Sequence, residues 1–238
     1  MAQRAVAITA ALVLALLTLG PIAAVLVRAG GLGAFRSGDL EALQFTIWQA
    51  LLSGFFSVAL AIPVARALAR RHFWGRSLLV SLLGAPFILP VIVAVMGLIA
   101  VFGQNGLVNT VMAALGGPKL DIYGLHGVIL AHVFFNLPLA TRMLLQAWLA
   151  IPGERFRLAA SMGLSPWGQF LTLEWPLIRR IAPGAFAVIF VICLTSFAVA
   201  LTLGGGPRAT TVELAIYQAM RFDFDHGRAA TLAMLKLH

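Results

Sequence analysis

Long apolar runs separated by short polar stretches dominate the chain. A helix needs about 20 mostly apolar residues to cross the hydrocarbon core of a bilayer. Five runs meet this length, at residues 5–27, 45–68, 77–102, 126–149 and 181–203. A sixth segment opens near Arg228, but the eleven residues that remain rise only about 16 Å as a helix. The pattern predicts an all-α, polytopic transmembrane helix bundle of about six helices, the last one truncated.

Prolines and polar side chains interrupt the third and fourth runs. Pro86 and Pro90 lie inside the third run, where a kink is tolerated if neighbouring helices or water satisfy the freed carbonyls. His132 and Asn136 are four residues apart in the fourth run and therefore share a helix face. Polar groups at membrane depth face the bundle interior or a cavity. They are candidates for a transport pathway, and hydrogen bonding to a neighbouring helix is the alternative.

A mixed stretch at residues 154–176 stands between the fourth and fifth runs. Small residues, including Ala159 and Ala160, alternate there with large apolar ones at helical spacing. We expect a helix, a turn at Gly163, and a second helix with Ser165 as its cap and Pro166 at its first position. Such a piece cannot cross lipid, so we expect it at the membrane surface, available to a soluble partner.

Composition agrees with a membrane protein and sets the expected topology. Only 11% of the 238 residues are charged, against about 25% in a soluble domain. The formal charge of +9 comes from short basic clusters between the apolar runs, and this favours membrane orientation over nucleic-acid binding. Arginine-rich loops at 66–76 and 154–180 indicate the cytoplasmic side. The N-terminus is then cytoplasmic, its first helix is a retained span and no signal peptide, and loops 103–125 and 204–227 are external.

The chain offers little for catalysis. Cys193 is the only cysteine, so no disulfide or thiol cluster can form within the chain. Asp223, Asp225 and His226 lie close in sequence, but we do not assign a metal site to them. His132 has no carboxylate or nucleophile nearby in sequence, which argues against an intramembrane enzyme. No glycine-rich phosphate loop follows a strand, so we expect no ATP binding and no cofactor.

The mixed stretch resembles the coupling loop, or EAA loop, of permease subunits of bacterial ABC importers. That motif is roughly E-A-A, three residues, Gly, and then Pro thirteen residues after the Gly. Gly163 and Pro176 keep this spacing, Ala159 falls on the second Ala, and Phe170 falls where the family often has an aromatic residue.

The stretch departs from the motif at two positions. Arg157 stands at the Glu position and Leu158 at the first Ala. Having Arg at the Glu position is itself a feature in which this stretch resembles the permeases of thiamine importers. Two further segments, FFNLPLATRMLLQAWLAIP at 134–152 and SFAVALTLGGGPRATTVELAIYQAMRFDFDHGRAA at 196–230, also resemble these permeases, in the first of their two homologous halves.

The resemblance implies a type I (MetI-like) permease fold in the bacterial inner membrane. A first helix and loop (1–44) would precede an incomplete core domain (45–238). The chain would not hydrolyse ATP; it would work with a cytoplasmic ABC ATPase dimer, a periplasmic substrate-binding protein, membrane lipid and a second permease half, and without nucleic acid. The cargo would be thiamine or its phosphates, with iron(III), molybdate, sulfate or a polyamine as the alternative.

The resemblance also implies roles for individual residues. The residues expected to couple the bundle to the ATPase are Arg157, Ala159, Ala160, Gly163, Phe170 and Pro176. The residues expected at the external mouth are Gly205, Gly206, Asp223 and Asp225. The two carboxylates would attract a cationic cargo, and the alternative is that they are only solvated surface charges.

Overall fold

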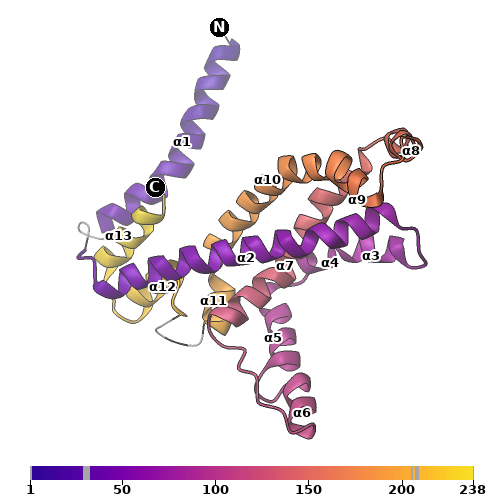
Figure 1. The fold of residues 1–238 in the computed structure, drawn as a ribbon. Coiled ribbons are helices and arrows are strands. Elements are labelled where there is room, and N and C mark those ends of the chain that lie inside the picture. The colour runs from indigo at the N-terminus through magenta and orange to yellow at the C-terminus, as the bar shows by residue number, and fades with distance from the viewer. Residues whose placement is uncertain (1, 29–32, 205, 207–208, 238) are drawn as a thin grey trace. The chain divides into compact units, whose positions relative to one another are not determined.

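The computed structural model describes residues 2–28, 33–204, 206 and 209–237. In these ranges the regular structure is helical, without strands. The elements (Figure 1) are α1 (Ala2–Arg28), α2 (Ser37–Arg70), α3 (Arg76–Leu82), α4 (Ala85–Ile88), α5 (Val91–Phe102), α6 (Leu107–Ala114), α7 (Leu125–Leu149), α8 (Gly153–Ser161), α9 (Pro166–Gln169), the π-helix η1 (Phe170–Glu174), α10 (Trp175–Leu194), α11 (Phe197–Leu203), α12 (Val212–Arg221) and α13 (His226–Leu237).

Four helical stretches of the described chain are long and apolar enough to cross a membrane. They are Ser37–Arg70, Val91–Ala114, Leu125–Leu149 and Pro166–Leu194. The described part of α1 adds a shorter apolar stretch, Val6–Gly20. The all-α polytopic bundle is confirmed, with four of the roughly six expected spans meeting this criterion.

The extents of several helices differ from those expected. α2 begins at Ser37, eight residues before the apolar run, because Asp39 accepts a hydrogen bond from the backbone N–H of Arg36 (2.9 Å) and caps the helix start. The third run is three helices, broken around Pro86 and Pro90 where a kink was expected. The fifth run is broken between α10 and α11, which its apolar composition did not indicate.

The expected external loop at 103–125 contains a short helix, α6. Asn109 of α6 is buried and donates hydrogen bonds from its side chain to the carbonyls of Gly103 and Leu120 (both 2.8 Å). Its side-chain oxygen accepts one from the Leu120 N–H (2.7 Å). One buried amide therefore fastens both ends of this segment.

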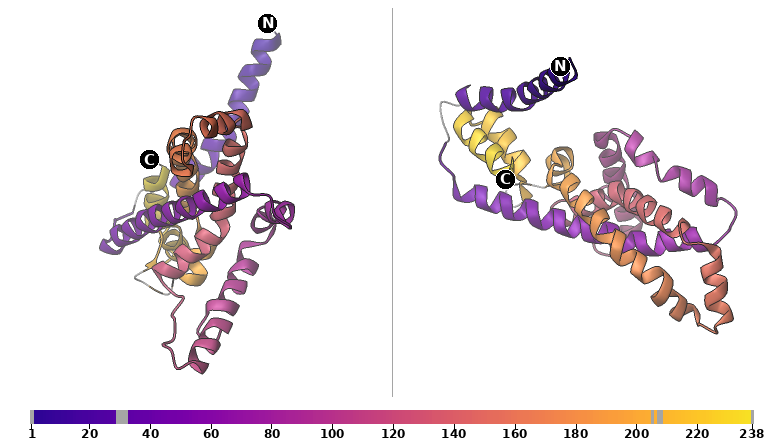
Figure 2. Two further views of the ribbon diagram at one scale, coloured as in Figure 1. Left: turned by 45° about the vertical axis from the view of Figure 1, so that its right-hand side comes forward. Right: turned by 90° about the horizontal axis from the view of Figure 1, so that it is seen from above.

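The chain forms two compact units. The first comprises residues 1–43 and 210–238, and the second residues 44–209. In the first unit α12 and α13 lie side by side (Figures 1 and 2). A small core supports them, made by Ala42, Val212, Ala215 and Leu232.

The second unit is built on α7, α10 and the part of α2 that follows residue 43. Its main core joins these three helices, with Leu144 and Trp148 from α7 and Ile178 and Ile189 from α10. Alanines at the contact let the helices approach closely: Ala50, Ala61, Ala65, Ala140 and Ala185. A second cluster packs α5 and α11 against α7. Helix α8 projects at one end of this unit (Figure 1).

Candidate functional site

The mixed stretch folds as two short helices joined by a tight turn. Helix α8 ends at Ser161, and Gly163 adopts a positive φ of 75°, a conformation typical of the glycine that ends a helix. The N–H of Leu164 then donates to the Ala159 carbonyl (3.0 Å). Ser165 caps α9 by accepting a hydrogen bond from the Gly168 N–H (3.1 Å). The predicted helix, turn and capped second helix are confirmed.

One face of α8 is packed and the other is open. Ala159 is buried, whereas Ala160 is exposed. Leu158 and, directly after the helix, Met162 are 62% and 72% exposed. Arg157 pairs with Glu154 on the surface at 2.7 Å. The structure therefore separates the two adjacent alanines, which sequence reasoning had grouped together.

The second helix of the stretch leads into a π-helix and then into α10. Phe170 opens the π-helix and stacks on Trp167, with ring centroids 5.2 Å apart. Pro176 is the second residue of α10 and directly follows the π-helix, inside a helix that runs without a break from Pro166 to Leu194.

Glu174, at the end of the π-helix, is a residue that sequence reasoning missed. Its side chain is fully buried, although it lies in the loop 154–180 that was expected to be charged and exposed at the membrane surface. Arg66 donates to it from Nε at 2.5 Å, and the indole N–H of Trp148 donates at 3.3 Å. The Nε of Arg70 lies 3.6 Å from the other carboxylate oxygen. The sequence did contain one indication of this burial. Glu174 lies close to an apolar span, and the nearby loops are rich in arginines that could pair with it.

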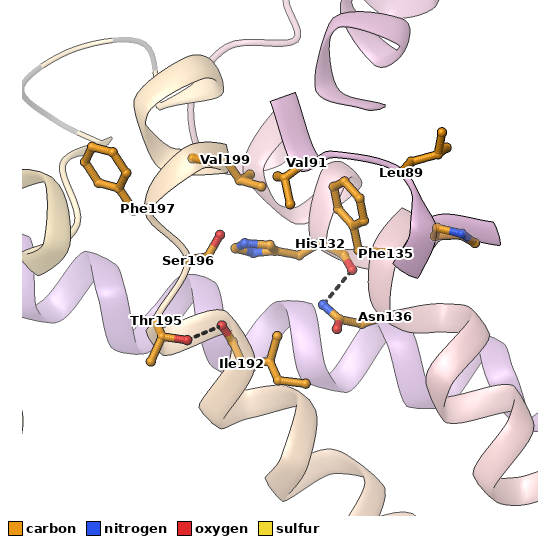
Figure 3. Close-up of a pocket in the computed structure, with 12 residues that line it drawn as sticks. Leu89, Val91, His132, Phe135, Asn136, Ile192, Thr195, Ser196, Phe197 and Val199 are labelled. Atoms are coloured by element: carbon orange, nitrogen blue, oxygen red, sulfur yellow. Dashed lines mark hydrogen bonds between the residues drawn. The ribbon is translucent and has the colours of Figure 1, made fainter. Parts of the chain in front are cut away.

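A cavity of about 380 Å³ lies in the second unit where two helices are interrupted. The α4–α5 break borders it on one side and the α10–α11 break on the other, with α7 between them (Figure 3). Interrupted helices next to a cavity are typical of binding sites in transporters. The lining residues are Pro86, Leu89, Val91, His132, Phe135, Asn136, Ile192, Thr195, Ser196, Phe197, Ala198 and Val199.

His132 and Asn136 both line this cavity, as their spacing predicted. The Nδ1 of His132 hydrogen-bonds with the Ser53 hydroxyl of α2 (3.2 Å). The Asn136 amide donates to the His132 carbonyl (2.9 Å) and lies 3.4 Å from the Cys193 sulfur of α10. Hydrogen bonding to neighbouring helices, the alternative considered from the sequence, is therefore present as well.

One ring nitrogen of His132 remains available. Nε2 is buried and has no hydrogen-bond partner among the described residues. Figure 3 shows the imidazole directed toward Ser196, at the start of α11. A buried polar atom without a partner costs free energy, so this nitrogen is suited to a water molecule or a ligand in the cavity.

The residues expected at the external mouth do not form one described site. Gly205 lies outside the described residues, and Gly206 belongs to the second unit. Asp223 and Asp225, in the first unit, pair with the two guanidinium nitrogens of Arg36 at 3.4 and 3.3 Å. Both acids are thus engaged in ion pairs within the first unit. In the described ranges, no group of three His, Cys, Asp or Glu side chains is arranged to hold a metal ion.

Comparison with known proteins finds relatives for most of the chain. A comparison with protein-family models finds no match. The chain is 46% identical over 231 residues to the thiamine transport system permease protein ThiP of Brucella abortus, covering 94% of this chain and 42% of that protein. It is 52% identical over 196 residues to the protein of the same name from Escherichia coli K12, covering 82% of this chain and 37% of that one.

Two further likenesses are more distant. The molybdenum transport system permease protein ModB of Azotobacter vinelandii is 27% identical over 201 residues, and the chain covers 88% of its length. A crystal structure of a bacterial ABC transporter involved in the import of alginate has a similar fold. Its TM-score is 0.70 at 16% identity, over 84% of this chain and 74% of that one.

Proposed function

We infer that the chain forms one half of the membrane pathway of a thiamine importer. It belongs to the permeases of bacterial ABC importers. It spans about two fifths of the length of the thiamine transport permeases that it matches. The identity of 46–52% is the observation that carries this proposal. The cargo is thiamine or its phosphates, delivered by a periplasmic binding protein and released into the cytoplasm.

The mixed stretch is the part that contacts the ATPase. Its open face presents Ala160, Leu158 and Met162, while Gly163 provides the turn between its helices. Ala159 packs inward and Phe170 stacks within the stretch, so these two hold its shape. Arg157 is exposed and engaged with Glu154 on this surface. Hydrolysis of ATP takes place in the separate ATPase dimer.

The cavity beside His132 is one part of the substrate pathway. It combines apolar walls with two polar side chains and an unpartnered ring nitrogen among the described atoms. That composition matches a small-molecule site, which is mostly apolar with a few convergent polar groups. The helix bundle has two packings, and each opens the pathway toward a different side of the membrane. ATP binding to the ATPase favours one of these packings.

The remaining partners follow from the same proposal. The N-terminus is cytoplasmic, and the segments 103–125 and 204–227 face the periplasm and dock the binding protein. A second permease half completes the pathway within the membrane. One of the structural relatives is described as an alginate ABC transporter in complex with its periplasmic protein, which supports this arrangement.

Uptake of labelled thiamine tests the proposal. Cells that lack their own thiamine importer would carry the full-length permease gene with its ATPase and binding protein. Uptake that requires ATP and is competed by thiamine diphosphate, and not by molybdate or iron(III), is the expected result. Uptake of an oxyanion, ferric iron or a polyamine by a correctly assembled complex, with none of thiamine, would replace the cargo and retain the permease function.

A further inference from the structure

Glu174 connects three elements of the second unit. The carboxylate comes from the π-helix, Arg66 and Arg70 come from the last turns of α2, and Trp148 comes from the end of α7. The side chain of Glu174 is 0% exposed, whereas those of Arg66 and Arg70 are 40% and 35% exposed. The arginines therefore reach in from the solvent side to hold a carboxylate that has no access to water.

Each arginine also contacts an aromatic ring of the mixed stretch. The guanidinium carbon of Arg66 lies 5.2 Å from the centroid of the Phe170 ring. That of Arg70 lies 4.0 Å from the centroid of Phe156, in α8. Both distances are within the range of cation–π attraction. The end of α2 is thus attached to α8, through Phe156, and to the π-helix, through Phe170 and Glu174.

The chemistry of Glu174 makes this attachment hard to release. A carboxylate removed from water is strongly unfavourable unless it is paired and hydrogen-bonded. Moving α2 away from the π-helix would leave the charge buried and unpaired. The elements consequently move together, because separating them costs more than displacing them as one body. A π-helix is rare and is frequently found at functional sites, and here it carries the carboxylate.

We propose that Glu174 is the positioning residue through which displacement of the mixed stretch moves α2 and α7. Its carboxylate is held by Arg66, Arg70 and Trp148. This inference rests on the proposed function, since it assigns the link between the surface that contacts the ATPase and α7, which lines the cavity, together with α2, which packs on α7. Ser53 of α2 and His132 of α7 meet beside the cavity, so a movement of either helix reaches the pathway.

The experiment uses the full-length permease assembled with its ATPase and binding protein in lipid vesicles. Thiamine imported and ATP hydrolysed are measured in the same sample and divided by the amount of assembled complex. Glu174→Gln keeps the side-chain shape and a hydrogen bond to Trp148 but removes the charge. Thiamine imported per ATP is expected to fall roughly fivefold or more, the range of a typical coupling between sites.

Arg66→Met and Arg71→Met provide a matched pair. Arg66 lies in the last turns of α2 and Arg71 directly follows that helix, but only Arg66 contacts Glu174 and Phe170. Arg66→Met is expected to lower the yield of thiamine per ATP as Glu174→Gln does, and Arg71→Met is not. Arg66 is partly exposed, so its replacement disturbs the fold less than replacement of the buried Glu174. If Glu174→Gln does not assemble, the ratio of thiamine to ATP in Arg66→Met tests the inference.

Two results would separate the possible failures. If the wild-type complex assembles and imports no thiamine, the proposed cargo falls, and the ratio to ATP is measured with the cargo that the complex does import. If the wild type imports thiamine while Glu174→Gln or Arg66→Met only lowers the amount of complex, with an unchanged ratio of thiamine to ATP, Glu174 has a structural role alone and this inference is overturned.

Discussion

Asp39 and Arg228 are 189 residues apart in the sequence, and a guanidinium nitrogen of Arg228 lies 2.5 Å from a carboxylate oxygen of Asp39. Arg228 Nε approaches both oxygens of the same carboxylate at 3.1 and 3.2 Å. The Asp39 side chain is 0% exposed and that of Arg228 is 13% exposed. This contact joins the start of α2 to the start of α13 within the first unit.

Removing one partner of this pair is expected to destabilise the first unit strongly. Asp39→Asn should lower the free energy of unfolding by about 3–5 kcal/mol, since it leaves the arginine without its buried counter-charge. Asp223→Asn is the control, because Asp223 contacts the same arginine but is 40% exposed and should cost at most about 1 kcal/mol. Thermal unfolding of the purified chain in detergent measures both. Equal losses in the two variants would contradict the expectation.

Replacing Gly163 is expected to weaken the mixed stretch for a backbone reason. An added Cβ meets nothing within 4 Å, so the cost of Gly163→Ala comes from the positive φ alone, about 1–2 kcal/mol. Gly153→Ala is the matched control, in open space and without a positive φ. Hydrogen exchange of residues 153–176 should become faster in the first variant only. Unchanged protection in Gly163→Ala would show that the turn does not depend on glycine.

The open face of α8 is expected to bind the ATPase. Leu158→Glu or Met162→Glu should raise the Kd for the ATPase subunit roughly tenfold or more, because interface residues that matter cost over 1 kcal/mol when lost. Leu115→Glu adds the same charge to another exposed leucine, outside the stretch. Co-purification and titration of the ATPase measure the effect. A Kd that rises equally in Leu115→Glu would remove the assignment of this face.

The free ring nitrogen of His132 is expected to contribute to substrate binding in the pathway. His132→Ala should raise the KM for uptake roughly fivefold, which corresponds to the loss of about 1 kcal/mol from one hydrogen bond. Thr141→Val is the control on the same helix; Thr141 is buried, does not line the cavity, and its hydroxyl has no partner among the described residues. That variant should leave KM unchanged. An equal KM in His132→Ala and the wild type would exclude the contact.

The sequence predicted much of this architecture because bilayers impose strict length and polarity requirements. Apolar runs located the long helices, and the combination of Gly163, Ser165 and Pro166 located the turn and restart in the mixed stretch. The 3.6-residue period placed His132 and Asn136 together on one cavity wall. These features depend on local sequence, which is why a single sequence was sufficient.

Features that depend on distant contacts were missed. The break at Thr195–Ser196 follows an uninterrupted apolar run, and it is supported by Gln49, whose amide donates to the Cys193 carbonyl at 2.9 Å. Glu174 resembles any loop acid until the folded chain brings Arg66 beside it. Nothing local in the sequence indicated either pairing, since the partners are more than 100 residues apart.

Cys193 has a practical consequence for following the motion of this chain. It is the only cysteine, and it lies fully buried against Asn136. A thiol-directed spin label or fluorophore added to the native chain would find no exposed sulfur to attach to. Cysteines introduced together at two exposed positions, such as Trp167 and Trp74, would then be the reactive attachment points, so the distance between two probes could be measured without first removing a native thiol.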